Sequence, residues 1–225
     1  RVFRIKCYMI PEAGRAAKGT AIVNLLDLRE GEKVTAMFPV TDEGKYLVLA
    51  TRYGVIKKTP MDEFENIRKG GMIAQNLREG DELIAAMLTS GEDHILIGTK
   101  KGKSIRFSEE DVRPMGRTAT GVRSILLDEE DEVVGAEKVI PGGSILAISE
   151  LGMGKRTNGE EYRPQGRGGK GIIAMKKTEK TGDLVCMKMV TDEDDIMLIS
   201  SEGTIIRLPA QQISVISRNT QGVRL

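Results

Sequence analysis

The sequence predicts an all-β, propeller-like array of four-stranded blades, and three observations support this prediction. A motif of apolar strand, short turn, glycine and second strand recurs about every 50 residues. The strand-like segments are rich in Val, Ile and Leu, and Gly- and Asp/Glu-rich turns separate them. No long stretch follows helical periodicity. Four short strands per unit at this period are typical of a radial blade array.

The first repeated motif is a hairpin with a basic residue four positions after its turn glycine. The complete copies begin at Tyr46, Ile95, Ile145 and Ile196. Their turn glycines are Gly54, Gly102, Gly152 and Gly203, and the basic residues that follow are Lys58, Arg106, Arg156 and Arg207. The opening RVFR fits the same register with Arg4, so we expect the chain to begin within a strand.

The second motif is a glycine box that follows each hairpin. The five copies span residues 14–19, 66–71, 116–121, 166–171 and 217–222. An apolar strand is expected after each box, such as AIVNLL or GIIAM. A third element, an acidic turn, leads into another strand in REGEKVTAMF, REGDELIAAM, DEEDEVVGA and KTGDLVCMKM.

These motifs predict one domain over residues 1–225, in which five copies of the unit are visible. The approximate repeats are 1–45, 46–94, 95–144, 145–195 and 196–225.

Charge is segregated within each repeat although the net charge is only +1. Residues 162–177 carry five basic side chains and no acid, and residues 112–127 carry three arginines and no acid. Acids gather in the turns instead, as in 128–132 and 192–195. In a ring of blades, segregation at equivalent positions produces a basic belt.

A basic belt on a ring-shaped array indicates double-stranded DNA as the partner. Arginine and lysine suit phosphate oxygens, and glycines allow a ligand to approach the main chain closely. Such backbone contacts weaken steeply with salt. Aromatic residues are few, which disfavours single-strand binding. The predicted DNA-binding residues are Arg4, Arg15, Lys18, Lys57, Lys58, Arg68, Lys69, Arg106, Arg117, Arg123, Lys155, Arg156, Arg163, Arg167, Lys170, Arg207 and Arg218.

Enzyme, metal and membrane functions find little support in the sequence. The glycine boxes lack the GK[ST] ending of a phosphate-binding P-loop. His94 is the only histidine, and the acidic run at 191–195 aligns with turns of the other repeats. We therefore expect no catalytic residue, no metal, no cofactor and no membrane contact. A protein-binding propeller stays open as an alternative, although the sequence contains no tryptophan and so lacks the Trp-Asp blade signature.

Several boxes resemble those of the A subunit of DNA gyrase. QGRGGKG at 165–171 differs at one position from the box Gln-Arg-Arg-Gly-Gly-Lys-Gly of that family. PEAGRAAKGTAIVNLL at 11–26, RPMGRTATGVR at 113–123 and SRNTQGVRL at 217–225 are also similar to its repeats. The box residues in this chain are Gln165, Gly166, Arg167, Gly168, Gly169, Lys170 and Gly171.

The resemblance implies a six-bladed β-pinwheel that exchanges strands between blades and wraps DNA to enable ATP-dependent negative supercoiling. It places ATP hydrolysis, which requires Mg²⁺, in the B subunit, and the cleaving tyrosine elsewhere in the A subunit. The domain itself would then be a non-catalytic part of a type II topoisomerase. Its partners would be DNA, the B subunit and the rest of the A subunit in an A2B2 assembly of the bacterial cytoplasm and nucleoid. The isolated domain is expected to be monomeric.

Two departures from the family pattern limit this expectation. The family's full box lies in the first blade, whereas QGRGGKG occupies the fourth box position and has Gly166 in place of the second arginine. We therefore expect the first blade to be at least partly missing, with DNA binding retained and wrapping impaired. The resemblance leaves one relative open, the C-terminal domain of topoisomerase IV, which binds DNA segments without strong wrapping.

Overall fold

The computed structural model describes residues 1–42 and 44–225, and the secondary structure of these residues is strand and 3-10 helix. The all-β prediction is confirmed. The strands are β1 (Tyr46–Thr51), β2 (Val55–Pro60), β3 (Leu83–Thr89), β4 (His94–Thr99), β5 (Lys103–Ser108), β6 (Val122–Arg123), β7 (Val133–Lys138), β8 (Ser144–Ser149), β9 (Met153–Asn158), β10 (Ile172–Ile173), β11 (Leu184–Val190), β12 (Asp195–Ile199), β13 (Ile205–Pro209) and β14 (Val223–Arg224). The 3-10 helices are η1 (Cys7–Met9), η2 (Ile22–Asn24), η3 (Met61–Phe64), η4 (Glu109–Asp111), η5 (Gly159–Glu161) and η6 (Ala210–Gln212).

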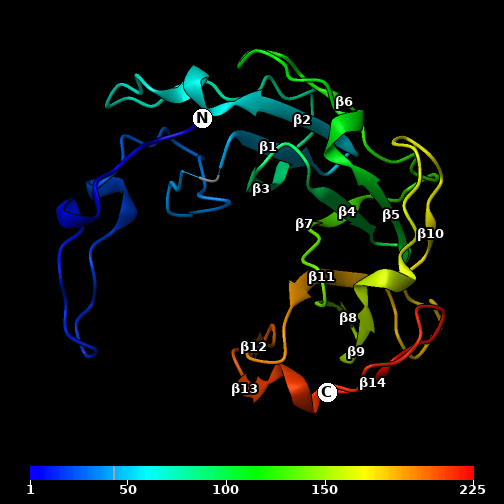
Figure 1. Ribbon diagram of the computed structural model, residues 1–225. Helices are drawn as coiled ribbons and strands as arrows, with labels where there is room; N and C mark the ends of the chain where they lie inside the picture. The colour runs from blue at the N-terminus through cyan, green and yellow to red at the C-terminus, as the bar shows by residue number, and fades with distance from the viewer. Residues whose placement is uncertain (43) are drawn as a thin grey trace.

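The strands form antiparallel sheets that follow one another along an arc (Figure 1). The three four-stranded sheets have the orders β3-β1-β2-β6, β7-β4-β5-β10 and β11-β8-β9-β14, and β12 pairs with β13 alone. Strands β3, β7 and β11 lie toward the inside of the arc, and β7 contacts both of the others. The sheets therefore radiate outward as blades.

The outer strand of each blade comes from the following repeat. Strand β6 follows the β4–β5 hairpin in sequence but pairs with β2 of the preceding blade, through Ile56–Val122 and Val55–Arg123. Strand β10 pairs with β5, and β14 with β9, in the same way. Exchanged strands tie each blade covalently and by hydrogen bonds to its neighbour.

The hydrophobic core consists of layers between adjacent blades. Val48 and Ile56 of the first blade pack with Ile95, Ile105 and Phe107 of the second. Because an interior blade has a neighbour on both faces, its hairpin strands are buried on both sides. This explains why YLVLAT and ILIGT read as continuous apolar runs rather than as alternating ones.

The closing glycine of each box is required where the exchanged strand crosses the edge of the preceding blade. Gly121 and Gly171 both have positive φ, 114° and 72°. A Cβ on Gly121 would lie 2.6 Å from the carbonyl oxygen of Ile56, and one on Gly171 would lie 2.4 Å from that of Ser104. Both the backbone conformation and the close approach favour glycine.

The first repeat departs from the prediction. Its AIVNLL segment contains the 3-10 helix η2 rather than a strand, and the predicted strand in REGEKVTAMF is also wrong, since residues 31–40 are neither strand nor helix. The strand expected after the second box is wrong as well, because only Met72 of that segment pairs, in a single bridge with Val2 of the opening segment. In the later repeats the strand after the acidic turn pairs with the first hairpin strand of the same blade. Residues 1–42 contain no counterpart of that hairpin strand.

Candidate nucleic-acid interface

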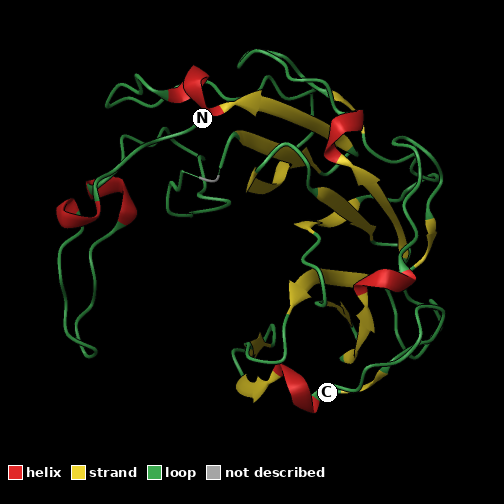
Figure 2. Cartoon of the chain, viewed as in Figure 1, coloured by secondary structure: helices red, strands yellow, loops and turns green. Residues whose placement is uncertain are grey.

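The box loops, defined here as residues 116–121, 166–171 and 217–222, lie along the outer edge of the arc (Figure 2). Each is held at both of its ends by strand β2, β5 or β9 of the preceding blade. For the first loop, Met115 N donates to the Lys58 carbonyl at 2.8 Å, and Ser124 N donates to the Gly54 carbonyl at 2.7 Å. The loop between these two attachments therefore projects from the edge of the blade.

Two fully buried lysines hold box loops from beneath. The Lys57 Nζ donates to the carbonyl oxygens of Ala74 and Arg117. The Lys155 Nζ donates to the carbonyl of Ser217 at 3.0 Å and to that of Arg218. These ammonium groups therefore satisfy main-chain acceptors of the loops that carry the box arginines.

Burial changes the titration of both lysines. Desolvation lowers the pKa of Lys57 to about 8, and the positive charge of Arg117 adds to this effect. Desolvation likewise lowers the pKa of Lys155 to about 8. Removal from water disfavours the charged form, so both groups become easier to deprotonate than an exposed lysine.

The next residue in each hairpin ties one blade to the following one. The Lys58 Nζ donates to the carbonyl of Glu109 at 2.8 Å. Arg106 Nη1 donates to the Gly159 carbonyl at 3.0 Å. Arg156 Nε donates to the Ile213 carbonyl at 2.9 Å, and its guanidinium pairs with Asp192. All three recipient carbonyls lie in or next to a 3-10 helix of the following repeat.

The structure does not support Lys57, Lys58, Lys155 and Arg156 as DNA contacts, because it places them in the interior of the blade array. All four are buried, and their charged groups are occupied by main-chain carbonyls and, for Lys58 and Arg156, also by a carboxylate. To contact DNA, these basic residues would have to face outward from the second hairpin strand. Instead, both faces of this strand are covered by neighbouring blades.

The other predicted contact residues keep solvent access. Arg106, Arg117, Arg167 and Arg218 are partly exposed. The exposed ones are Arg4, Arg15, Lys18, Arg68, Lys69, Arg123, Arg163, Lys170 and Arg207. The box residues Gly166 and Lys170 are exposed, and Gln165, Gly168, Gly169 and Gly171 are partly exposed.

The guanidinium groups of the box arginines are oriented by main-chain carbonyls. Arg167 Nε donates to the Asp111 carbonyl at 3.0 Å, and its Nη1 donates to the Arg123 carbonyl. The Arg218 Nη1 donates to the Ile173 carbonyl. Arg117 instead lies 3.5 Å from the Glu63 carboxylate. Arg167 and Arg218 thus have several N–H donors left for a ligand, held in fixed directions.

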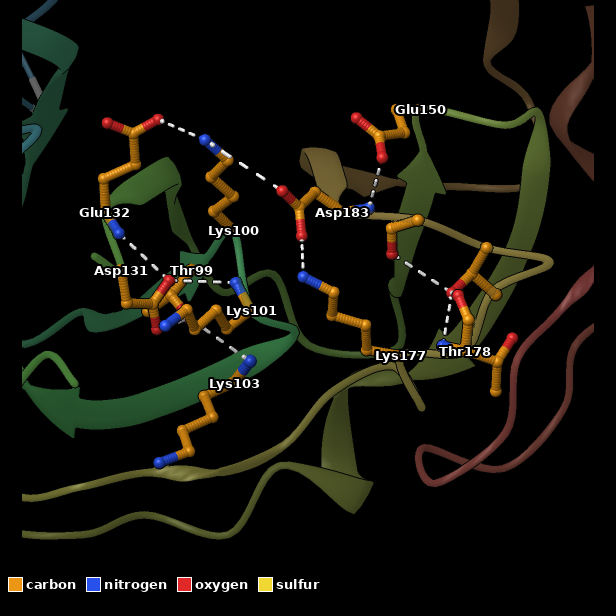
Figure 3. Close-up of polar contacts among 12 residues, drawn as sticks. Thr99, Lys100, Lys101, Lys103, Asp131, Glu132, Glu150, Lys177, Thr178 and Asp183 are labelled. Atoms are coloured by element: carbon orange, nitrogen blue, oxygen red, sulfur yellow. Dashed lines mark hydrogen bonds and ion pairs between the residues drawn. The ribbon is translucent and has the colours of Figure 1, made fainter. Parts of the chain in front are cut away.

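Acids pair with bases at the junctions between blades, and Figure 3 shows the junction around Lys100 and Asp183. The Lys100 ammonium lies 3.4 Å from Glu132 and 4.0 Å from Asp183, which belongs to the following blade. Asp183 also pairs with Lys177. Arg52 of the preceding blade is 3.9 Å from Glu132. Much of the compensating negative charge is therefore located away from the box loops.

Arg78 and Arg113 are not among the DNA contacts predicted from the sequence. Both are exposed. Arg78 lies in the acidic turn before β3 and lines a groove together with Arg123 and Arg167. Its position in the acidic turn gave no clear signal, because the equivalent residue is Arg29 in the first repeat and Asp128 in the next.

Two structural findings concern the described residues, 1–42 and 44–225. These residues contain no group of three or more His, Cys, Asp or Glu side chains arranged to hold a metal ion. None of their helices has the length and apolar character needed to span a membrane.

Comparison with protein families gives a match over most of the chain. The family model described as DNA gyrase C-terminal domain, beta-propeller, matches residues 1–41, 45–90, 93–140, 143–188 and 194–225.

Individual relatives agree with this match. The chain is 47% identical over 227 residues to the A subunit of DNA gyrase from Klebsiella oxytoca and covers 26% of that protein. It is 50% identical to the corresponding protein of Clostridium acetobutylicum and covers 27% of it. The chain thus spans about a quarter of the length of the curated relatives it matches.

Solved structures share the fold. A structure of a DNA gyrase A C-terminal domain superposes with a TM-score of 0.82 at 28% identity, covering 93% of this chain and 71% of that one. The C-terminal domain of DNA topoisomerase IV superposes with a TM-score of 0.85 at 23% identity, covering 92% of this chain and 66% of the other. The second likeness concerns the fold alone.

Proposed function

Because this chain belongs to the DNA gyrase C-terminal domain family, we propose that it binds duplex DNA along its box loops and bends it around the outer edge of the blades. The single observation that carries this proposal is the placement of the box loops. Successive blades present exposed or partly exposed basic residues on one edge, while carboxylates of the acidic turns pair with bases at the blade junctions. A curved row of cations suits a curved polyanion.

The energetics of bending are compatible with several distributed contacts. Smooth bending of a 20–30 base-pair site costs on the order of 1–6 kcal/mol. A set of phosphate contacts, each salt-dependent and independent of base sequence, offsets a cost of that size. The same contacts predict affinity for any duplex sequence.

In the whole protein, we propose that this domain is non-catalytic and needs no cofactor of its own. Its partners would be the B subunit and the rest of the A subunit in an A2B2 type II topoisomerase of the bacterial cytoplasm, associated with the nucleoid. The B subunit would supply ATP hydrolysis and Mg²⁺ chemistry. The supercoiling activity belongs to that assembly.

Two measurements test the proposal. The first is the affinity for a 40 base-pair duplex as a function of salt, which should fall steeply as salt rises. The second is relaxation of a closed plasmid by a type I topoisomerase in the presence of the chain. Retained positive writhe supports chiral wrapping, and strong binding without a change in linking number indicates binding without wrapping. Affinity that is insensitive to salt would contradict the proposal.

A further inference from the structure

A basic groove lies between the first two complete blades, beside the 166–171 box loop. Its volume is about 520 Å³. The residues that line it are Tyr53, Gly54, Val55, Arg78, Arg123, Ile125, Leu127, Arg167 and Gly168. These nine residues include three arginines and no acid, which is unusual in a chain with nearly equal numbers of basic and acidic residues.

The three arginines reach the groove from three different repeats. Arg78 lies on the loop before β3, Arg123 ends β6, and Arg167 belongs to the 166–171 box loop. Repulsion between three cations opposes their gathering in one place, so a bound anion would relieve it. A site assembled from separate segments in this way favours an anionic ligand.

One wall of the groove is rigidly built. Gly168 N donates to the Ser124 carbonyl at 2.8 Å, and Leu126 N donates to the Gly169 carbonyl at 2.8 Å. The Arg167 guanidinium is held by two carbonyls through its Nε and Nη1 atoms. Its Nη2 donors are therefore available in a fixed direction, and little side-chain entropy is lost when they bind.

The chemistry of the lining selects a phosphate group. Guanidinium donors match phosphate oxygens in a two-pronged geometry. Buried Val55 and Ile125 and partly buried Leu127 supply apolar lining, which suits the sugar beside a backbone phosphate. The groove is open and lies beside a box loop, so a phosphate that is part of a long duplex can enter it.

We propose that Arg78, Arg123 and Arg167 form a groove that binds a backbone phosphate of the DNA. This contact would fix the path of the DNA between two blades. This inference rests on the proposed DNA-binding function and deepens it. Arg78, which is outside the glycine boxes, becomes a DNA-contact residue.

The test compares Arg78→Gln with the unaltered 225-residue chain by fluorescence anisotropy on a 40 base-pair duplex over a range of salt. The slope of log K against log salt should decrease in magnitude by about 0.9, the value for one lost phosphate contact. Lys180→Gln is the matched control because it removes one exposed positive charge from a turn that does not line the groove. It should leave the slope unchanged.

A second measurement distinguishes a backbone phosphate of DNA from free inorganic phosphate as the ligand of the groove. Inorganic phosphate is titrated into the free chain, and the Nε–Hε signals of the three arginines are followed by NMR. Shifts in these signals together with the altered DNA slope support a phosphate groove used by DNA. Shifts without an altered slope identify a free-phosphate site and overturn the DNA assignment.

The DNA affinity of the unaltered chain distinguishes a wrong groove assignment from a wrong function. If the unaltered chain binds DNA with strong salt dependence while Arg78→Gln and Lys180→Gln behave alike, the groove is not a contact site. If the unaltered chain itself shows no salt-dependent affinity, the function is wrong as well.

Discussion

Two kinds of box loop occupy equivalent places on the outer edge but rest on different supports. The loops at 116–121 and 217–222 are held from beneath by the ammonium groups of Lys57 and Lys155. The loop at 166–171 rests on Ile105, whose Cδ1 would lie 3.6 Å from a Cβ on Gly169. All three supporting residues stand three positions after a turn glycine and are fully buried.

The difference shows that a basic residue of the repeat need not lie on the edge that we propose binds DNA. A buried ammonium can satisfy loop carbonyls, whereas the glycine-rich box closes against an apolar side chain and is held by main-chain hydrogen bonds. We infer that loop position is set by the strand exchange, and that the residue beneath the loop determines how it is stabilised. Substitutions of the supporting residues, compared with substitutions of exposed basic residues, test this inference about how the loops are stabilised.

The largest effect is expected for Ile105→Lys. This change places an ammonium beneath a loop that, unlike its neighbours, is seated on an apolar contact. An uncompensated buried charge costs about 3–5 kcal/mol of unfolding free energy. Urea denaturation of the variant and the unaltered chain measures this cost. Equal unfolding free energies for the variant and the unaltered chain would show that carbonyls of the 166–171 loop can accept from a lysine, as those of the other two loops do. The proposed difference between the loops would then be wrong.

Arg156 and Arg207 occupy equivalent positions in their hairpins and allow a similar comparison for the hydrogen bonds that join adjacent blades. The Arg156 side chain is 5% exposed and bonded to the following repeat, whereas Arg207 is 69% exposed and pairs with Asp195 of its own hairpin. Arg156→Met should lower the unfolding free energy by about 3 kcal/mol, because it leaves the buried Ile213 carbonyl unsatisfied and removes the pair with the exposed Asp192. Arg207→Met should change it by less than about 0.5 kcal/mol. If denaturant unfolding gave similar losses of unfolding free energy for the two variants, Arg156 would not stabilise the contact between adjacent blades as proposed.

Removal of a supporting lysine should have a smaller cost. Lys57→Met deletes the donor for the Ala74 and Arg117 carbonyls but fills the same space, so a loss of about 2 kcal/mol is expected from the unsatisfied acceptors. Lys170→Met, on an exposed box residue, should stay within about 0.5 kcal/mol of the unaltered chain. Denaturation curves that rank the two variants in the opposite order would show that Lys57 does not support the loop.

The pH dependence of the unfolding free energy has a definite sign. The pKa of Lys57 is about 8 in the folded chain and 10.5 for an ordinary lysine. Between these values the unfolded chain binds more protons at this site, so the unfolding free energy rises with pH through this window. The difference between the unaltered chain and Lys57→Met should therefore grow from pH 8 to 10.5. If the difference in unfolding free energy became smaller over this pH range, the Ala74 and Arg117 carbonyls would be stabilising the charged form of Lys57 in the folded chain.

Much of the fold could be predicted from the sequence because the repeat spacing is regular. The turn glycines and closing glycines mark backbone positions with positive φ, and Gly121 and Gly171 have the close contacts that explain them. The first repeat could not be predicted in the same way. A strand requires a partner, and the segment AIVNLL has the composition of a strand without the hairpin that pairs with it in other repeats.

The candidate interface was only partly predictable. Spacing located the box loops and their arginines, but it did not separate Lys57 and Lys58 from Lys170. Alternation along a strand usually distinguishes a buried face from an exposed one. In this array both faces of the hairpin are covered by neighbouring blades, so the usual pattern gives no information about exposure. Arg78 was missed because its neighbours in sequence are acidic, and only the fold brings it beside Arg167.

The most direct test compares the salt dependence of DNA binding in Lys170→Gln and Lys57→Met. Exposed Lys170 is one of the predicted DNA contacts, so its loss should reduce the magnitude of the slope of log K against log salt by about 0.9. Buried Lys57 supports a loop, so its loss should weaken binding at every salt concentration while leaving the slope unchanged. A reduced slope in Lys57→Met, or an unchanged slope in Lys170→Gln, would contradict this division between supporting and contacting residues.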